Sequence, residues 1–441
     1  MEIENLVNKQ YKKINNIALP LILTNVSSLI IELCDEAMVG RTSLAAFASV
    51  GLIGTTINSI TGVLGMTSVA FNIIGAKSKG RNDYAGLKND FSINILISLF
   101  CGLLFYILTL LFGDLLLKNI YHLKGNVLDE ASIYLNIFSL SLGLNMVLFT
   151  FSSYFKIMDK TKYVLYGNAA ASISNVIFDY ILMFGHLGSP KMGIRGNALG
   201  SILALVLNVL IYMAAVRHDK LIQISKIKVL ELLKKTLKLS FPLMGQEILE
   251  STLIIVAVNS ILSHIGILEV SIYNLLLAVV SIASMPMYAY SQASLTIISE
   301  NAGAGNYDNI KKTPKQCLLL AILFYSALSI IFLLMKNYIP RIITNDYKLI
   351  YNSIKYMPLV FLANIFYIPS TIYKYSLQGI EDEKWVLFSS IIINILGLLL
   401  IFMLSQIINL KLQGVYVELA LNYIILSIVF YYRFEKDINK K

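Results

Sequence analysis

Long apolar runs separated by short polar connections divide the whole chain. A helix needs about 20 mostly apolar residues to cross a hydrocarbon core of about 30 Å. Runs of adequate length fall near residues 14–40, 46–74, 90–113, 132–157, 162–186, 194–216, 237–263, 268–298, 314–336, 350–377, 385–409 and 414–432. The pattern therefore predicts an all-α polytopic membrane protein with twelve transmembrane helices.

The two halves of the chain resemble each other. The longest polar connection, near 217–236, lies almost at the midpoint. Sliding the chain by about half its length brings Pro20 onto Pro242 and the stretch KTKYVLY onto DEKWVLF, and a shift of one further position brings Tyr84 onto Tyr307. Similar residues at nearly the same offset in three separated places indicate an internal repeat of six helices.

Six is an even number, so both halves enter the membrane in the same orientation. We expect an N-lobe at 1–216 and a C-lobe at 237–441, joined by a cytoplasmic linker at 217–236. A pseudo-two-fold axis along the membrane normal would relate the lobes. Such lobes can rock open to either side of the membrane, which is typical of transporters, although the same symmetry also suits a lipid flippase.

Composition and charge agree with a membrane protein. The chain is 57% hydrophobic and only 14% charged, whereas soluble domains carry about 25% charged residues. If the N-terminus is cytoplasmic, about 26 of the 36 Lys and Arg residues lie on the cytoplasmic side, as the positive-inside rule requires. We therefore expect a monomeric, multi-pass plasma membrane protein with both termini in the cytoplasm and no nucleic-acid partner.

Several kinds of chemistry lack their usual signals in the sequence. The start has no short apolar core with a small-residue cleavage site, so no cleaved signal peptide is expected. The three cysteines have no paired spacing, the four histidines fall at helix ends or in loops, and no nucleotide-binding motif occurs. The protein is predicted not to be an enzyme and to need no cofactor.

Acidic residues within the apolar runs are the candidates for function. A charge near the middle of the bilayer costs roughly 2.5 to 3.5 kcal/mol, so an acid persists there when it faces a cavity, a partner or a transported ion. The acids singled out are Glu32, Asp35 and Glu36 in the first span, Asp179 in the fifth, and Glu247 and Glu250 in the seventh. Glu32 and Glu36 have a plainer alternative, because they lie near the outer end and can reach the headgroups.

Asn175 and Asp179 lie four residues apart, which places an amide beside a carboxylate on one helix face. Together with Asp35, these groups could bind a desolvated Na⁺ or hold a proton. At the repeat offset, Asp35 and Asp179 correspond to Ala257 and Ile401, so the two acids are not part of the shared scaffold. For Asp179 and Glu250 the alternative role is structural, with the acid satisfied by neighbouring Ser or Asn side chains.

Taken in order, several stretches resemble the multidrug and toxic compound extrusion (MATE) transporters over nearly the whole length. They are ALPLILTNVSS with DEAMVGR, the glycine-containing loops GAKSKGRNDY and NAGAGNYD, the turns KIMDKTK and LQGIEDEK, and MGIRGNALGS. The resemblance implies exchange of H⁺ or Na⁺ for cationic drugs or metabolites. It assigns ion coupling to Asp35, Asn175, Asp179 and Ser201, helix bending to Pro20, and a second ion or cargo site to Glu250. Glu247, an acid in the same span, is a further candidate for that second site.

The chain also departs from the family pattern. An acid expected in the tenth helix is replaced near Tyr367, and the two turns carry Lys156 and Gln378 where arginine is usual. These departures leave the coupling ion open between H⁺ and Na⁺.

The main hypothesis is an ion-coupled antiporter that exports cationic, amphipathic molecules by alternating access. The first alternative is a flippase or exporter of one lipid-linked or biosynthetic product, which would need a cavity rich in Lys and Arg. We expect almost no basic residue in mid-span, which disfavours it. A membrane-embedded enzyme would need a paired nucleophile and base within the spans.

Overall fold

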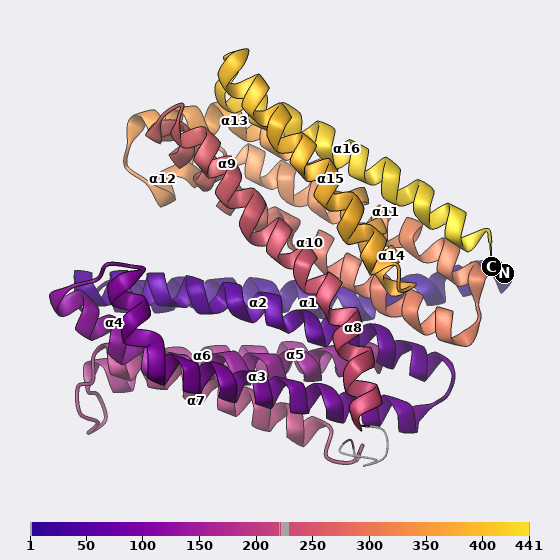
Figure 1. Cartoon of the computed structure of the whole chain (residues 1–441), viewed down its shortest axis with the longest axis horizontal. Coiled ribbons are helices and arrows are strands. Elements are labelled where there is room, and N and C mark those ends of the chain that lie inside the picture. The colour runs from indigo at the N-terminus through magenta and orange to yellow at the C-terminus, as the bar shows by residue number, and fades with distance from the viewer. Residues whose placement is uncertain (1, 220, 222–228, 441) are drawn as a thin grey trace. The chain divides into compact units, whose positions relative to one another are not determined.

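The computed structural model describes residues 2–219, 221 and 229–440, and it consists almost entirely of helices (Figure 1). Residues 220 and 222–228 of the predicted linker lie outside the described residues. The first half contains α1 (Glu2–Val39), α2 (Leu44–Gly80), α3 (Tyr84–Asn119), α4 (Gly125–Phe138), α5 (Leu140–Ile157), α6 (Lys162–Phe184) and α7 (Ile194–Ala215).

The second half contains α8 (Val229–Ile248), the π-helix η1 (Leu249–Leu253), α9 (Ile254–Ser263), α10 (Ile267–Ala304), α11 (Tyr307–Leu334), α12 (Ile339–Ile343), α13 (Tyr347–Ile365), α14 (Tyr367–Gly379), α15 (Glu383–Phe402), the π-helix η2 (Met403–Ile407) and α16 (Lys411–Ile438).

Eleven helical stretches in the described chain are long and apolar enough to cross a membrane. Four of them are interrupted helices that each serve as one span: α4 with α5, α8 with α9, α13 with α14, and α15 with η2. The twelfth is α6, whose 23 residues suffice in length, while Asn168, Asn175 and Asp179 lower its mean hydropathy. The predicted all-helical, twelve-span membrane fold is confirmed.

The backbone repeats at the offset that the sequence predicts. Left-handed residues are uncommon outside glycine, yet Asp159 (φ 55°) recurs as Glu381 (φ 68°), and Leu187 (φ 54°) recurs as Asn409 (φ 62°). Both pairs are separated by the same interval as Pro20 and Pro242, and they lie in the connections before α6 and α15 and before α7 and α16. The same turns therefore join the same helices in both halves.

Helix starts repeat as well. Asp83 accepts a hydrogen bond from the backbone N–H of Gly86 at 2.8 Å and begins α3. Asn306, at the equivalent place in the second half, accepts from the backbone N–H of Asn309 at 3.2 Å and begins α11. Such caps satisfy donors that the first helical turn leaves free. The polar loop stretches noted in the sequence thus act as helix caps.

The chain forms two compact units. One comprises Met1–Ile22, Lys79–Asn82 and Gly245–Lys441, and the other comprises Leu23–Ser78 and Asp83–Met244. The boundaries within α1 and α8 fall just after Pro20 and Pro242, so each of these helices contributes to both units. The predicted lobe boundaries describe the repeat and stay a prediction, whereas these units are defined by packing.

Ion pairs fix the first part of α1 within its unit. The Lys13 ammonium lies 2.8 Å from one carboxylate oxygen of Glu300 on α10, and the Lys79 ammonium lies 3.2 Å from the other. Gly80 packs on the backbone of Glu300 so closely that a Cβ there would overlap the Glu300 carbonyl oxygen. Segments that are distant in sequence are therefore tied to one point on α10.

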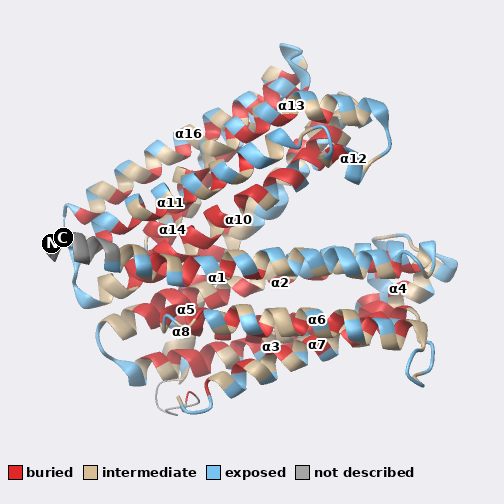
Figure 2. Cartoon of the chain, turned by 180° about the vertical axis from the view of Figure 1, so that it is seen from behind, coloured by how far each residue is buried: buried red, intermediate tan, exposed pale blue. Residues whose placement is uncertain are grey.

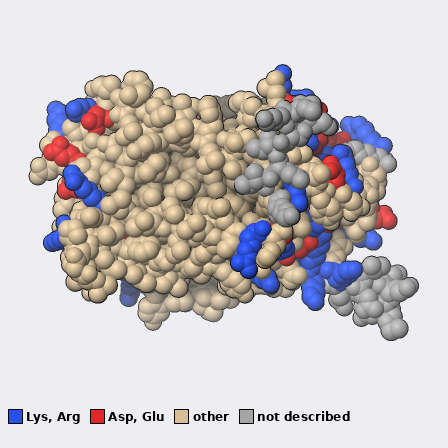
Figure 3. Space-filling view, turned by 90° about the horizontal axis from the view of Figure 1, so that it is seen from below, with Lys and Arg blue, Asp and Glu red and all other residues tan. Residues whose placement is uncertain are grey.

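Buried and exposed residues lie on different faces of the helices (Figure 2). Apolar side chains remain exposed on α3, including Leu99, Phe100, Leu103, Leu110 and Leu111. On the face in Figure 3, Lys, Arg, Asp and Glu gather towards both ends and leave a broad uncharged band between them. An apolar band with charged ends suits a surface that contacts lipid chains.

Small residues allow close helix packing within a unit. Gly102 on α3 and Gly143 on α5 face each other, and a Cβ at Gly102 would overlap the Cα of Gly143. Apolar area gains little when helices associate in lipid, so van der Waals contact at small residues contributes much of the packing energy.

We predict that Gly102→Ala destabilises the protein, because the added methyl group forces α3 and α5 apart at a cost of about 1–3 kcal/mol. The matched control is Gly54→Ala on α2, where a Cβ meets nothing within 4 Å. Melting temperatures of the purified proteins in detergent should fall for Gly102→Ala and stay unchanged or rise for Gly54→Ala. Equal melting temperatures would contradict the packing described here.

Candidate functional site

The candidate site of the N-terminal half lies where α6 and α7 pack together. Gly196 of α7 lies against the backbone of Leu182 and Met183, and a Cβ at Gly200 would overlap Oδ1 of Asp179. Gly196 and Gly200 lie one turn apart, and they let α7 approach α6 closely. The backbone of α7 therefore covers the Asp179 carboxylate. Asp179 is fully buried as a result.

Amide donors hold Asp179 from its own helix and from α7. Asn175 Nδ2 donates to Asp179 Oδ2 at 3.3 Å and to Ser201 Oγ at 3.3 Å. Asn197 Nδ2 donates to the same Asp179 oxygen at 3.2 Å. The four-residue spacing predicted the first contact, because residues at i and i+4 share a helix face.

Asn197 also joins the two acids of the site. Its amide nitrogen donates to Asp35 Oδ1 on α1 as well as to Asp179 Oδ2 on α6. Asn197 is fully buried, and Asp35 is partly exposed. One amide group therefore bridges two carboxyl groups from separate helices, and this residue was not among those singled out from the sequence.

The structure separates the acids of the first span. Asp35 lies in the cluster with Asn175, Asp179 and Ser201, all of which the resemblance assigned to one site. Glu32 and Glu36 are exposed side chains outside these contacts. The geometry gives these two glutamates no partner in the cluster, and their placement near the headgroups stays a prediction.

Two buried oxygens in the cluster accept no hydrogen bond: Asp179 Oδ1 and Asn197 Oδ1. Buried polar atoms normally have a partner, so each unpaired one needs an explanation. The described residues hold no group of three or more His, Cys, Asp or Glu side chains placed for a metal ion. A Na⁺ here would therefore rely on amide and hydroxyl oxygens beside the two carboxylates, which is the donor set present.

A different arrangement surrounds Glu250 in the second half. Glu250 lies in the π-helix η1, and its carboxylate forms an ion pair with Lys374 of α14 at 2.5 Å. Gln246, one turn earlier, donates to the other carboxylate oxygen of Glu250 and to Ser390 Oγ of α15 at 3.1 Å. Glu250 is thus charge-paired within the protein.

Two lysines near the ends of predicted spans are buried. Lys374 is 6% exposed and Lys156 is 8% exposed, and both lie in the last few residues of the predicted runs 350–377 and 132–157, so the expectation of almost no basic residue in mid-span is not contradicted. Lys374 lies close to the end of the predicted span, where a lysine could reach the surface. Instead the ion pair with Glu250 compensates its charge and keeps it buried.

The remaining sequence candidates are Glu247 and Pro20. Glu247 accepts a hydrogen bond from Ser251 Oγ at 2.6 Å. Pro20 lies inside the continuous helix α1, and the bend assigned to it stays a prediction. Glu418 of α16, which is 2% exposed, lies inside the last predicted span and is not among the acids predicted from the sequence to be functional.

Comparison with known proteins identifies the class of protein that this fold represents. The sequence model of the MatE family matches residues 20–181 and again residues 242–403. The second match begins and ends at the positions that the internal repeat pairs with the ends of the first. Together the two matches cover more than half of the chain.

Individual proteins of known class are also similar to this chain. The chain is 26% identical over 345 residues to the probable multidrug resistance protein NorM of Thermotoga maritima, covering 77% of this chain and 73% of that protein. A MOP superfamily transporter from Pyrococcus furiosus, described as having a binding pocket of reverse polarity, matches in structure with a TM-score of 0.88 at 17% identity, covering 98% and 97% of the two chains.

A multidrug resistance MATE family transporter in an outward-facing conformation matches with a TM-score of 0.86 at 17% identity, covering 98% of this chain and 96% of that one. At this identity the two structures establish the fold. The protein is thus a polytopic membrane transporter and not an enzyme. It belongs to the MatE family, as the sequence resemblance implied.

We predict that Asn197→Leu lowers stability, because Asp35 and Asp179 lose their shared donor. The loss of a buried hydrogen bond costs roughly 1–3 kcal/mol. In an Asp35→Asn background the same substitution should cost less, since only one carboxylate then needs the amide. Melting temperatures of the four proteins of this double-mutant cycle test the coupling, and equal losses in both backgrounds would show that Asn197 does not bridge the acids.

A second prediction concerns Glu250 and Lys374. Glu250→Gln should destabilise the protein by about 3–5 kcal/mol, because it leaves the buried Lys374 ammonium unpaired. The double variant Glu250→Gln with Lys374→Met should recover most of this loss, and Glu247→Gln is the matched control with a small effect. A double variant as unstable as Glu250→Gln alone would exclude the ion pair as the cause.

Proposed function

We propose that this protein is an ion-coupled antiporter that exports cationic, amphipathic drugs or metabolites across the plasma membrane. The observation that carries the proposal is the pair of carboxyl groups, Asp35 and Asp179, bridged by the Asn197 amide. Family membership supports an efflux role. The coupling ion, H⁺ or Na⁺, and the cationic cargo are the finer parts of the proposal.

The charge of this cluster is the physical basis of coupling. Two carboxylates close together in a region of low dielectric repel each other, and each is costly to bury without compensation. Asn197, Asn175 and Ser201 are neutral and cannot offset a negative charge. A proton shared by the two acids, or a Na⁺ between them, would remove the repulsion.

An ion that binds here can drive transport only if it prefers one state of the protein. Linkage requires that the ion bind more tightly to the cargo-free state than to the cargo-bound state. Asp35 lies on α1, whose two halves belong to different compact units, so a change at Asp35 acts on a helix that both units share. We infer that ion binding at Asp35 alters the packing of α1 near Pro20 and so weakens cargo binding.

We propose that Glu250 binds the cationic cargo or a second ion. Lys374 limits how it can do so. Because the Lys374 ammonium already compensates Glu250, a cationic cargo would have to displace that ammonium to use the carboxylate. Glu247 is three residues earlier and hydrogen-bonded to Ser251, and we keep it as a weaker candidate for attracting cations.

The proposed topology places both termini in the cytoplasm. In Figure 3 the Lys and Arg side chains gather mainly at one end of the face shown, as expected if that end is cytoplasmic. Nothing in the cluster around Asp35 requires a second copy of the chain, and we propose that the transporter acts as a monomer.

A flippase or exporter of one dedicated anionic product is the second candidate. The buried Lys374 and Lys156 favour it more than the sequence suggested, because lysine can bind phosphate. Lys374, however, is paired with Glu250 at 2.5 Å, which leaves its charge compensated. The cationic antiporter therefore has the stronger support.

Uptake of ethidium into everted membrane vesicles tests the proposal, with an imposed pH gradient compared with an imposed Na⁺ gradient. We predict that one gradient drives uptake by the wild type, and that Asp35→Asn and Asp179→Asn reduce uptake to the level without a gradient. Glu36→Gln is the matched control, since Glu36 is exposed and adjacent to Asp35.

Each vesicle preparation needs equal amounts of folded transporter, measured by fluorescence-detected size exclusion. Gradient-driven uptake that survives Asp179→Asn would refute ion coupling through this cluster. Failure of the wild type to transport ethidium under either gradient would move support to the dedicated exporter.

A further inference from the structure

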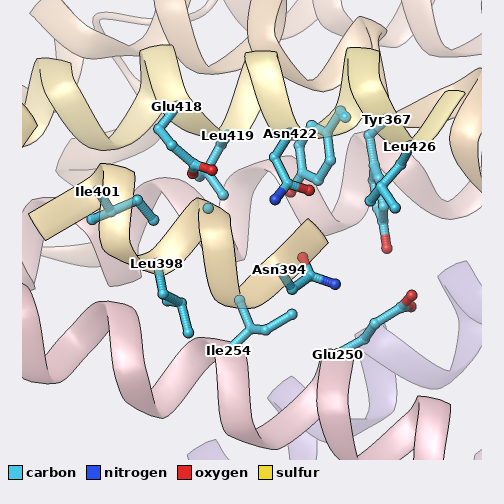
Figure 4. Close-up of a pocket in the computed structure, with 12 residues that line it drawn as sticks. Glu250, Ile254, Tyr367, Asn394, Leu398, Ile401, Glu418, Leu419, Asn422 and Leu426 are labelled. Carbon is cyan, nitrogen blue, oxygen red and sulfur yellow. The ribbon is translucent and has the colours of Figure 1, made fainter. Parts of the chain in front are cut away.

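A small cavity lies between η1, α9, α14, α15 and α16, entirely within one compact unit. Its volume is about 70 Å³, and Glu418, Asn422 and Asn394 supply polar groups to its wall (Figure 4). A site for a drug-sized molecule needs roughly 300–1,000 Å³, whereas a water molecule needs only about 10–15 Å³ of such volume. The cavity therefore suits an ion with few waters and not a drug.

Glu418 is the uncompensated charge of this cavity. It is 2% exposed, and among the described residues that line the cavity none is Lys or Arg. Glu250, at the other end of the cavity in Figure 4, already has Lys374 as its partner. A buried carboxylate without a cationic partner is costly. A bound cation would remove this cost at Glu418, whereas Glu250 already has its cationic partner.

Two asparagines line the same cavity as Glu418 and carry neutral amide oxygens. Asn422, one helical turn later, is 6% exposed, and its Oδ1 is buried without a hydrogen-bond donor. Asn394 is 9% exposed and lies on the facing helix α15. A carboxylate with buried amide oxygens is a donor set that a dehydrated hard cation prefers, whereas a proton would need only the carboxylate.

The glycine at the centre of the site fits the same interpretation. A Cβ built at Gly397 would collide with both Glu418 Oε1 and Asn422 Nδ2. The cavity is also flanked by the two π-helices, because Ile254 directly follows η1 and Ile401 lies shortly before η2. Single π-helical turns weaken the regular backbone bonding and are frequent at functional sites.

The repeat relates this cavity to the cluster around Asp179. At the offset that pairs Pro20 with Pro242, Glu418 and Asn422 take the places of Gly196 and Gly200, and Gly397 takes the place of Asn175. In the first half, α6 carries the acid and amide while α7 carries the glycines. In the second half α16 carries the acid and amide while α15 carries the glycine. Equivalent helix pairs thus hold an acid and an amide against glycine in both halves, with the roles of the helices exchanged.

We propose that this cavity is a second ion site, in which Glu418, Asn422 and Asn394 bind one Na⁺. Equilibrium binding of ²²Na⁺ to the purified full-length protein tests the site without any transport. The outcome does not depend on whether Asp35 and Asp179 drive efflux, because every protein in the comparison carries Asp179→Asn.

We expect the Asp179→Asn protein to bind Na⁺, and the added changes Glu418→Gln and Gly397→Ala each to weaken that binding at least about tenfold, or 1.4 kcal/mol. Glu418→Gln removes the charge, whereas Gly397→Ala keeps it and fills the site. The matched control is Glu435→Gln, on the same helix but paired with Lys311 at 3.4 Å and Lys315 at 3.6 Å, and it should bind Na⁺ as before.

Two results would overturn the site. One is absence of Na⁺ binding in the folded Asp179→Asn protein, which would make Glu418 a buried, protonated packing residue. The other is unchanged Na⁺ affinity after Glu418→Gln. If the Glu418→Gln protein does not fold, the Gly397→Ala protein provides the test. A folded Gly397→Ala protein with unchanged Na⁺ affinity would equally exclude the cavity as the site.

Discussion

The cost of burying negative charge in a region of low dielectric governs the functional part of this structure. Asp35 and Asp179 come from different helices and accept hydrogen bonds from one Asn197 amide. The amide donates a hydrogen bond to each acid but leaves the negative charge, so the arrangement is stable when a cation or proton joins it. Ion binding and the position of α1 are therefore expected to be linked, which is the requirement for coupled transport.

The same constraint has another solution around Glu250, where Lys374 supplies the positive charge from within the chain. A permanent internal ion pair needs no external ion. The two halves share the same helices, helix caps and left-handed turns. Their buried charged residues differ. Differences in charge on a repeated frame let an ion act at Asp35 and Asp179, while Glu250 has its counter-charge in Lys374.

Much of the fold could be predicted from the sequence, because apolar runs and helix caps act locally. The Asn175 and Asp179 pair was predictable for the same reason, since residues four apart on a helix share a face. Asn197 was not, because a single asparagine near the start of an apolar helix gives no signal of its distant partners. Its place became visible only once Gly196 and Gly200 brought α7 onto α6.

Lys374 is a residue whose burial the sequence could not predict. A lysine near the end of an apolar run can reach the membrane surface, and only tertiary structure reveals that Glu250 holds it inside. Glu418 lies within its predicted span 414–432, and the signal for it was available in the sequence. What the sequence could not give was its surroundings, since Asn394 and Gly397 come from another helix.

An ion bound at Asp35 and Asp179 is expected to weaken cargo binding, and the cargo is expected to weaken ion binding to the same degree. Equilibrium binding of ethidium to the purified transporter, measured by fluorescence polarisation across a series of pH values and Na⁺ concentrations, tests this most directly. The coupling ion should weaken ethidium binding to the wild type and have little effect on Asp35→Asn. Ethidium affinity that depends on the ion equally in both proteins would contradict the claim.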